Sequence, residues 1–204
     1  MQRKRQILGI ILLPVGGILI NAARAEYLRP RDASAQERKE AERLAPLVLK
    51  ADLSDKILYV VQDGQVVKSY TFASGSPKYP TPKGTFKIDK VVWNPEWIPP
   101  PDAKWAKGKQ AKAAGDPSNP MQLVKIFFKE PDYYIHGTDQ VDTIGSAASH
   151  GCLRLDPTDA AELAIRVMQA SGARRDSTWY QNAIERGETR TVVLPQKVEM
   201  IITA

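Results

Sequence analysis

The chemically reactive side chains that are scarce in this sequence gather within one short window. Cys152 is the single cysteine, and the two histidines, His136 and His150, precede it within the same stretch. An unperturbed thiol, with a pKa of about 8.5, is only a few per cent ionised at neutral pH, so a nucleophilic cysteine needs a neighbouring base such as an imidazole. The window therefore predicts nucleophilic catalysis by Cys152, with a neighbouring imidazole, from His136 or His150, as the base that keeps it ionised.

Glycines stand beside both of these residues and suit the same chemistry. Gly137 follows His136 at the end of an apolar stretch, and Gly151 precedes Cys152. A glycine beside the nucleophile adopts backbone angles closed to other residues and lets a substrate carbonyl approach the main-chain N–H groups. We therefore expect the N–H groups of Gly151 and Cys152 to form an oxyanion hole.

Two other interpretations of the lone thiol are open. It could be a small buried hydrophobic residue, or it could bind zinc together with His136, His150 and either Asp139 or Asp142. Structural zinc sites generally take four closely spaced Cys or His ligands, whereas the glycine beside the thiol favours a nucleophile. We therefore expect no metal and no other cofactor.

Alternating apolar residues, separated by turn residues, predict that a β-rich domain occupies residues 51–204. The first two strands should form a hairpin through the turn at Asp63-Gly64. The expected strands cover residues 56–61, 65–72, 84–92, 122–128, 133–136, 191–194 and 198–202, and a further apolar run covers 153–155.

Helices are expected mainly in the last third of the chain. The Asp156-Pro157 pair, an apolar face and Gly172 predict one helix that packs on the sheet. A second helix is expected from Ser177 to Arg186. Residues 94–119 form a long proline-containing stretch between strands, and loops of that length tend to be lids or binding elements, although a flexible insertion fits equally well.

The first part of the chain resembles an export segment. Residues 1–25 combine a basic start, the apolar run 7–20 and a small-residue site at 23–25. Cleavage is expected before Glu26, followed by a spacer with a short helix over 26–50. An uncleaved anchor is the alternative, but the apolar run is shorter than the ~20 residues of a spanning helix, so no stable membrane span is expected after cleavage.

Charge and cysteine content exclude some classes of function. The net charge is +6, but four of the basic residues lie in the export segment, and without them the charge is +2. A charge this small, with no basic block interleaved with aromatic residues, does not predict nucleic-acid binding. An exported protein meets an oxidising compartment, so an unpaired cysteine there is either buried or retained for its chemistry.

The motifs around the histidines and the cysteine resemble those of a known family. The stretches IHGT at 135–138 and SHGCLRL at 149–155 are similar to the signature of the L,D-transpeptidase (YkuD) catalytic domain. The stretch TPKGTF at 81–86 also resembles this family. The resemblance covers residues 51–202, and its His-to-Cys motif is highly specific.

The resemblance implies both a fold and a reaction. The fold would be mainly β, a curved β-sandwich or barrel-like α+β domain with one or two packed helices. Cys152 would attack the bond between an L-centre and a D-amino acid in a peptidoglycan stem peptide, and an acceptor amine would resolve the thioester. His136 would be the base, and the carbonyl of Gly137 would orient its ring, without any metal or nucleotide.

Other residues could bind the substrate. Arg154 could bind a substrate carboxylate through both of its terminal nitrogens, although it could instead pair with an acidic neighbour for structure. His150 and Ser149 match the motif and are expected to shape the loop beside the substrate. Trp97 and Tyr134, with Trp93 and Trp105, could line the groove, but aromatic residues are as often part of a core.

The identity of the acceptor separates the remaining alternatives. With an amine acceptor the enzyme is a transpeptidase of cell wall biogenesis, and its partners are peptidoglycan stem peptides or an outer-membrane lipoprotein. With water as acceptor it is an L,D-carboxypeptidase or an amidase. A wall-binding protein without activity is disfavoured, because binding alone requires no thiolate. The expected location is the periplasm or cell envelope.

Overall fold

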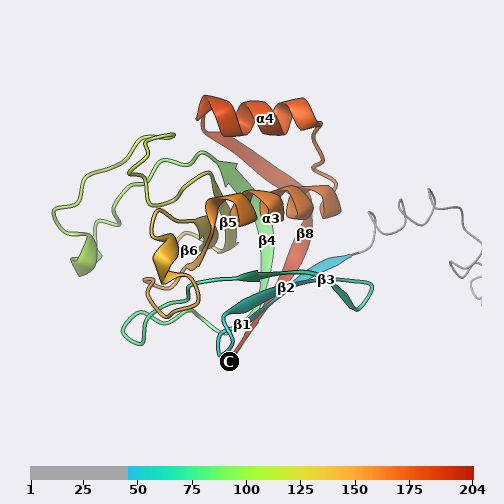
Figure 1. Cartoon of the computed structure of the whole chain (residues 1–204), viewed down its shortest axis with the longest axis horizontal. Coiled ribbons are helices and arrows are strands. Elements are labelled where there is room, and N and C mark those ends of the chain that lie inside the picture. The colour runs from blue at the N-terminus through green and yellow to red at the C-terminus, as the bar shows by residue number, and fades with distance from the viewer. Residues whose placement is uncertain (1–45) are drawn as a thin grey trace, which may run out of the picture. The chain divides into compact units, whose positions relative to one another are not determined.

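One curved, nearly closed sheet dominates the computed structural model, which describes residues 46–204 (Figure 1). Its strands are β1 (Leu47–Asp52), β2 (Ile57–Gln62), β3 (Gln65–Thr71), β4 (Gly84–Trp93), β5 (Val124–Lys129), β6 (Tyr133–Gly137), β7 (Leu153–Leu155) and β8 (Arg190–Thr203). The order across the sheet is β3-β2-β1-β8-β4-β5-β6-β7. Only the β1–β8 and β6–β7 pairs are parallel. The expected β-rich class with packed helices is confirmed.

Helix α3 (Pro157–Ala170) supplies one side of the hydrophobic core. Asp156 caps it by accepting a hydrogen bond from the Thr158 N–H at 2.8 Å, as the sequence predicts. Its apolar face is buried against the inner face of the sheet, and Leu163 and Met168 have no exposed surface. This packing fixes the position of β7, which leads directly into the helix.

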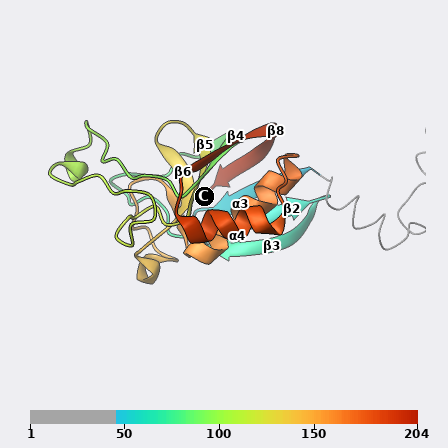
Figure 2. The same ribbon diagram turned by 90° about the horizontal axis from the view of Figure 1, so that it is seen from above.

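Helix α4 (Ser177–Arg186) has the predicted bounds and ends at Gly187, whose φ of 65° suits a glycine cap. It lies above α3 in Figure 1 and overlaps it when the domain is seen from above in Figure 2. Trp179 of α4 meets the buried Trp93 edge-on, with ring centroids 6.0 Å apart. Trp93 is therefore part of the core and does not line a groove.

The strands differ from the predicted ones at three places, one of which is a strand that was not predicted. Strand β1 begins at Leu47, inside the expected spacer, and its alternate residues are buried. Strand β5 begins at Val124 because Gln122 and Leu123 have positive φ angles of 20° and 54°. The two expected closing strands form one strand, β8, because a register shift against β4 accommodates Pro195, which lacks an N–H to donate.

The expectations for the export signal at 1–25, and for most of the spacer that follows it, lie outside the described residues. Within residues 46–204, the helices are all too short or too polar to span a bilayer. Two short 3-10 helices, η1 (Lys104–Ala106) and η2 (Val141–Thr143), interrupt the loops that flank β5, β6 and β7.

Candidate active site

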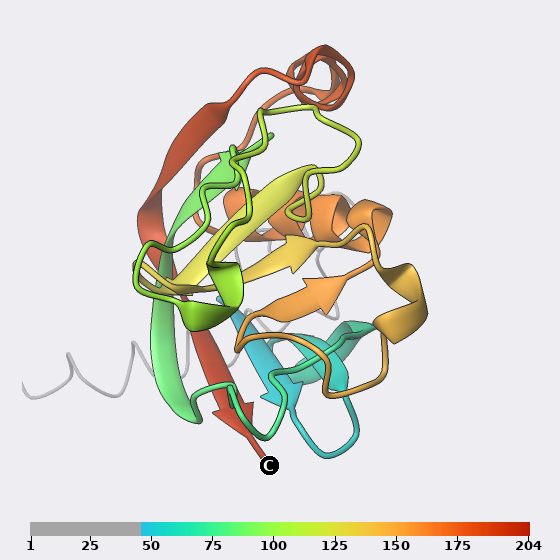
Figure 3. The same ribbon diagram turned by 90° about the vertical axis from the view of Figure 1, so that its left-hand side faces the viewer.

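Strands β5, β6 and β7 are neighbours in the sheet (Figure 3), and the predicted reactive residues lie on β6 and β7 or directly beside them. The register pairs Ile135 with Leu153, and both are fully buried in the core. Since side chains alternate along a strand, His136 and Cys152 both point to the opposite face. Adjacent strands lie about 4.8 Å apart, so these two side chains can meet across β6 and β7.

A groove of about 1280 Å³ lies on this face. Its floor includes His136, Cys152 and Arg154, together with Tyr134 and Lys125. The expected constellation is thus in one cavity that a peptide can enter, rather than in the core.

The imidazole of His136 is buried and held by main-chain carbonyls. Its Nδ1 lies 2.5 Å from the carbonyl oxygen of Gly137, which can only accept, so Nδ1 carries the proton and Nε2 is left as the acceptor. Residue 137 must be glycine, because a Cβ would lie 2.6 Å from the carbonyl oxygen of Gln122. The structure therefore places Gly137 where the resemblance expects an orienting group.

The pKa shifts of Cys152 and His136 both favour the neutral form of the group at rest. Burial raises the pKa of the Cys152 thiol to about 11. Burial, followed by the positive charge of Arg154, lowers the pKa of His136 to about 3. Both groups lie near the cations Lys125 and Arg154, which oppose an imidazolium, so the prediction that His136 holds the resting sulfur as a thiolate gains no support from these pKa shifts. His136 can still act as a base during attack.

Ser149 pins the loop that carries the nucleophile. Its buried hydroxyl donates to the carbonyl of Cys152 at 2.6 Å and accepts from the N–H of Gly151 at 3.0 Å. The hydroxyl is therefore engaged within the loop and is not directed at a ligand. The N–H of Gly151 is engaged in the same way, which leaves the Cys152 N–H as the better placed oxyanion donor of the two.

Arg154 faces the groove from β7, directly opposite His136 in the register. Its guanidinium donates to the side-chain oxygen of Gln140 at 3.1 Å. Across residues 46–204 it forms no ion pair, so the alternative of a structural pairing with an acidic neighbour is not supported. Burial lowers the pKa of this guanidinium, which is half-buried and remains a cation that a carboxylate can reach.

Aromatic rings join the long 94–119 loop to the motif loop. The ring of His150 stacks on that of Trp105, with ring centroids 4.0 Å apart and an interplanar angle of 19°. Its second ring neighbour is Tyr79, at a centroid distance of 4.8 Å. Trp97 pairs with Lys112 through two main-chain hydrogen bonds, and both residues line the groove. The long loop therefore forms a wall of the groove, which favours a binding element over a flexible insertion.

Lys125 is the site residue that sequence reasoning missed. It lies opposite His136 in the β5–β6 register and lines the groove beside Tyr134. The alternation of β5, in which Val124 and Ile126 are apolar, signals that residue 125 faces away from the core, but pairing to β6 is required to bring it to this site.

The zinc alternative does not gain support from the geometry. Among residues 46–204, His, Cys, Asp and Glu side chains form no group of three or more that could hold a metal ion. His150 stacks on Trp105 beside the groove, whereas His136 is buried.

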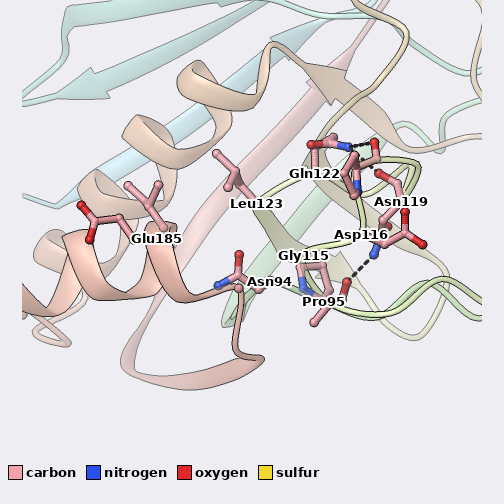
Figure 4. A pocket seen from close by; sticks show the side chains of 12 residues that line it. Asn94, Pro95, Gly115, Asp116, Asn119, Gln122, Leu123 and Glu185 are labelled. Atoms are coloured by element: carbon pink, nitrogen blue, oxygen red, sulfur yellow. Dashed lines mark hydrogen bonds between the residues drawn. The ribbon is translucent and has the colours of Figure 1, made fainter.

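A second, smaller pocket of about 380 Å³ lies between α4 and the long loop (Figure 4). Its amide side chains hold main-chain carbonyls: Asn119 donates to Pro95 at 2.8 Å and to Ala113 at 3.0 Å. Asn94 donates to the carbonyls of Ala183 and Glu188. None of the described residues that line this pocket is a cysteine or a histidine, so it is not the candidate active site.

The fold and groove define a β-rich domain that presents one cysteine and two histidines to the same cavity. A family model described as the L,D-transpeptidase catalytic domain, YkuD, matches residues 46–193. The chain therefore belongs to the L,D-transpeptidase catalytic domain family, as its motifs indicate.

Individual relatives are distant. YkuD of Bacillus licheniformis is 26% identical over 119 residues, which cover 58% of this chain and 59% of the relative. YqjB of Bacillus subtilis is 30% identical over 111 residues, which cover 52% of this chain and 57% of the relative. The matched region thus spans less than two thirds of the length of these relatives.

Two solved structures also show a low similarity to this chain, both in sequence identity and in TM-score. An L,D-transpeptidase from Mycobacterium smegmatis has a TM-score of 0.46 and 22% identity, with 78% of this chain and 59% of that chain covered. L,D-transpeptidase 3 from Mycobacterium tuberculosis has a TM-score of 0.47 and 17% identity, with 78% and 62% covered.

Proposed function

We propose that this protein is a peptidoglycan L,D-transpeptidase that carries the acyl group of a stem peptide as a thioester on Cys152 and passes it to an amine. The observation that supports this most is the shared placement of His136 and Cys152 on one face of β6 and β7, in the larger groove. Membership of the L,D-transpeptidase family supports the same reaction class.

The proton and bond changes follow from the geometry of His136. Its Nε2 accepts the thiol proton as the sulfur attacks the carbonyl carbon, and the main-chain N–H of Cys152 stabilises the oxyanion. The C–N bond then breaks, and the leaving D-amino acid takes the proton from His136. An acceptor amine attacks the thioester, gives a proton back to His136, and the sulfur leaves and is protonated again.

The charges of the groove suit a peptide with free carboxylates. Arg154 forms no ion pair within the described residues and is free to bind the terminal carboxylate of a stem peptide. Trp97, Tyr134 and Trp105 provide apolar walls on which the peptide can pack. His150 acts by holding Trp105 in the wall, which is a positioning role rather than that of a second base.

The expected setting is the periplasm or cell envelope, where peptidoglycan stem peptides are available. The acceptor is the amine of a second stem, and an outer-membrane lipoprotein with an accessible amine is the alternative. This assignment depends on the export signal predicted at 1–25.

Product analysis tests the proposal. The protein is incubated with tetrapeptide stems, with and without an added D-amino acid, and the products are measured by mass spectrometry. Cross-linked dimers or exchanged D-amino acid are expected. Tripeptide as the sole product would instead support the L,D-carboxypeptidase alternative, and the absence of any product with the full set of stems would contradict the proposed reaction.

A further inference from the structure

Lys125 occupies an unusual position for a lysine. Its side chain is half-buried in the groove, where its Nζ donates to the carbonyl of Glu96 at 3.2 Å and lies 4.9 Å from the ring centroid of Tyr134. Across residues 46–204 it has no carboxylate partner. A desolvated ammonium without a counterion is costly, so an anion that forms beside it is stabilised.

Tyr134 links this cation to the nucleophile. In the strand register it lies beside Cys152, since Ile135 pairs with Leu153. The main chain and the hydroxyl of Tyr134, together with the charge of Lys125, lower the pKa of Cys152 against the larger effect of burial. Its ring meets His136 edge-on at 5.4 Å. Burial, followed by the charge of Cys152, raises the pKa of Tyr134, so its hydroxyl keeps the proton that it donates.

The hydrogen bonds of the sulfur must change when it ionises. The thiol of Cys152 donates to the carbonyl oxygen of Asp132 at 3.3 Å, and this oxygen repels a thiolate. The donors of Tyr134 and the positive charge of Lys125 attract a thiolate instead. The resting contact with Asp132 therefore stabilises the thiol, whereas Tyr134 and Lys125 favour the anion.

We propose that Tyr134 and Lys125 form a thiolate-stabilising pair, in which the Tyr134 hydroxyl donates to the Cys152 sulfur and the Lys125 ammonium, seated on the Tyr134 ring, supplies the positive charge. With its hydroxyl on the reacting atom, Tyr134 would be a catalytic residue, whereas Lys125 would be a positioning residue. The proposal rests on the proposed function in one respect only, that Cys152 is the nucleophile.

Several charged or titratable groups face the sulfur. They are Lys125 on β5, Tyr134 and His136 on β6, Arg154 on β7, Asp132 before β6, and Asp139, which acts through Arg154. Each variant below changes one residue and leaves the other groups as they are in the wild type. A difference between two variants in the pH profile of the thiol therefore reports the substituted group.

The pair is tested by the rate at which iodoacetamide alkylates Cys152 between pH 7 and pH 11, followed by intact mass. The thiolate forms a bond to carbon and iodide leaves, so the rate below the pKa reports the thiolate fraction. Tyr134→Phe is expected to shift the profile to higher pH by about one unit, with about tenfold slower alkylation at pH 8. Lys125→Met is expected to slow it about threefold or more at pH 8.

Matched variants separate charge from structure. Lys125→Arg keeps the charge and should restore the wild-type profile. Lys129→Met removes an exposed lysine at the far end of the same strand and should leave the profile within about twofold of the wild type. If Lys125→Met does not fold, as judged by thermal unfolding, Lys125→Gln takes its place.

Profiles of Tyr134→Phe and of the charge-removing Lys125 variant that coincide with the wild type would overturn the pair. A wild-type thiol that iodoacetamide cannot alkylate at any pH would overturn it too. Because the reagent needs no stem peptide, a protein that shows these shifts but turns over no stems would refute the proposed function and leave the pair standing.

Discussion

The two pockets of this domain differ in what their polar atoms are doing. In the pocket beside α4, the amides of Asn94 and Asn119 are consumed by main-chain carbonyls of the long loop and of α4 (Figure 4). In the groove, Arg154 and Lys125 are cations without ion pairs among the described residues, and Cys152 donates only one weak sulfur contact. The pocket beside α4 therefore connects the long loop to α4 and is called the joint below. The groove, in contrast, contains charged groups that can still bind a ligand.

This difference shows why polarity alone does not identify a functional pocket. Buried polar groups are normally satisfied by hydrogen bonds, so a pocket whose amides are all engaged contributes to stability. A buried cation without a counterion is maintained at a cost, and such groups concentrate at functional sites. The comparison predicts that changes in the groove affect the reaction, whereas changes in the joint affect unfolding.

The largest effect is expected for Cys152→Ala. Transfer of stem peptides should become undetectable, a loss of about a thousandfold or more, because no other described residue in the groove is a thiol. The thermal unfolding temperature should be nearly unchanged, since one half-buried sulfur is removed. Full activity in this variant would exclude the mechanism.

His136→Gln should slow transfer by about a hundredfold or more, because it removes the general base. It also has a signature in stability. The pKa of His136 is lowered to about 3, so between pH 6.5 and pH 3 the unfolded chain binds a proton that the native state does not. The wild type should therefore lose about 1 to 3 kcal/mol more than the variant between pH 7 and pH 4.5. Urea unfolding of both proteins measures this, and parallel losses would argue against the buried neutral ring.

Asn119→Ala tests the joint. Its buried amide donates to two carbonyls and accepts from the Met121 N–H at 2.9 Å, so the substitution leaves main-chain groups unpaired. The free energy of unfolding should fall by about 2 to 3 kcal/mol. Transfer measured well below the unfolding temperature should fall less than tenfold. A greater loss of transfer than of stability would mean that the joint belongs to the active site.

Glu185→Gln should have the smallest effect. Glu185 lines the same pocket but is exposed and forms no ion pair within the described residues. The change in unfolding free energy should stay within about 0.5 kcal/mol, with transfer unaltered. A large change in either measurement would indicate that this pocket has a role of its own.

The parts of the structure that depend on nearby residues are predictable from the sequence. The bounds of α3 and α4 follow from Asp156 and Gly187, which act within one helical turn. The continuity of β8 is not predictable in this way, because Pro195 reads as a break and the compensating register shift lies in β4. Non-local pairing decides that outcome.

The features of the candidate site also fall into those that local sequence predicts and those that depend on the assembled fold. The motif that contains His136 and Cys152 singles these residues out as candidates before any fold is known. The protonation of the resting pair and the place of Lys125 come from burial and from the pairing of β5 with β6, which are properties of the assembled sheet. The chemistry of a thiol is local, but its pKa is set by the whole environment.

The most direct test of the central claim is to identify the acylated atom. The protein is mixed with a stem-peptide donor or a carbapenem-like acylating agent, and intact mass and peptide mapping follow the adduct. One acyl group is expected on the peptide that contains Cys152, formed much more slowly in His136→Gln and absent from Cys152→Ala. An adduct that persists in Cys152→Ala, or that maps to another residue, would contradict it.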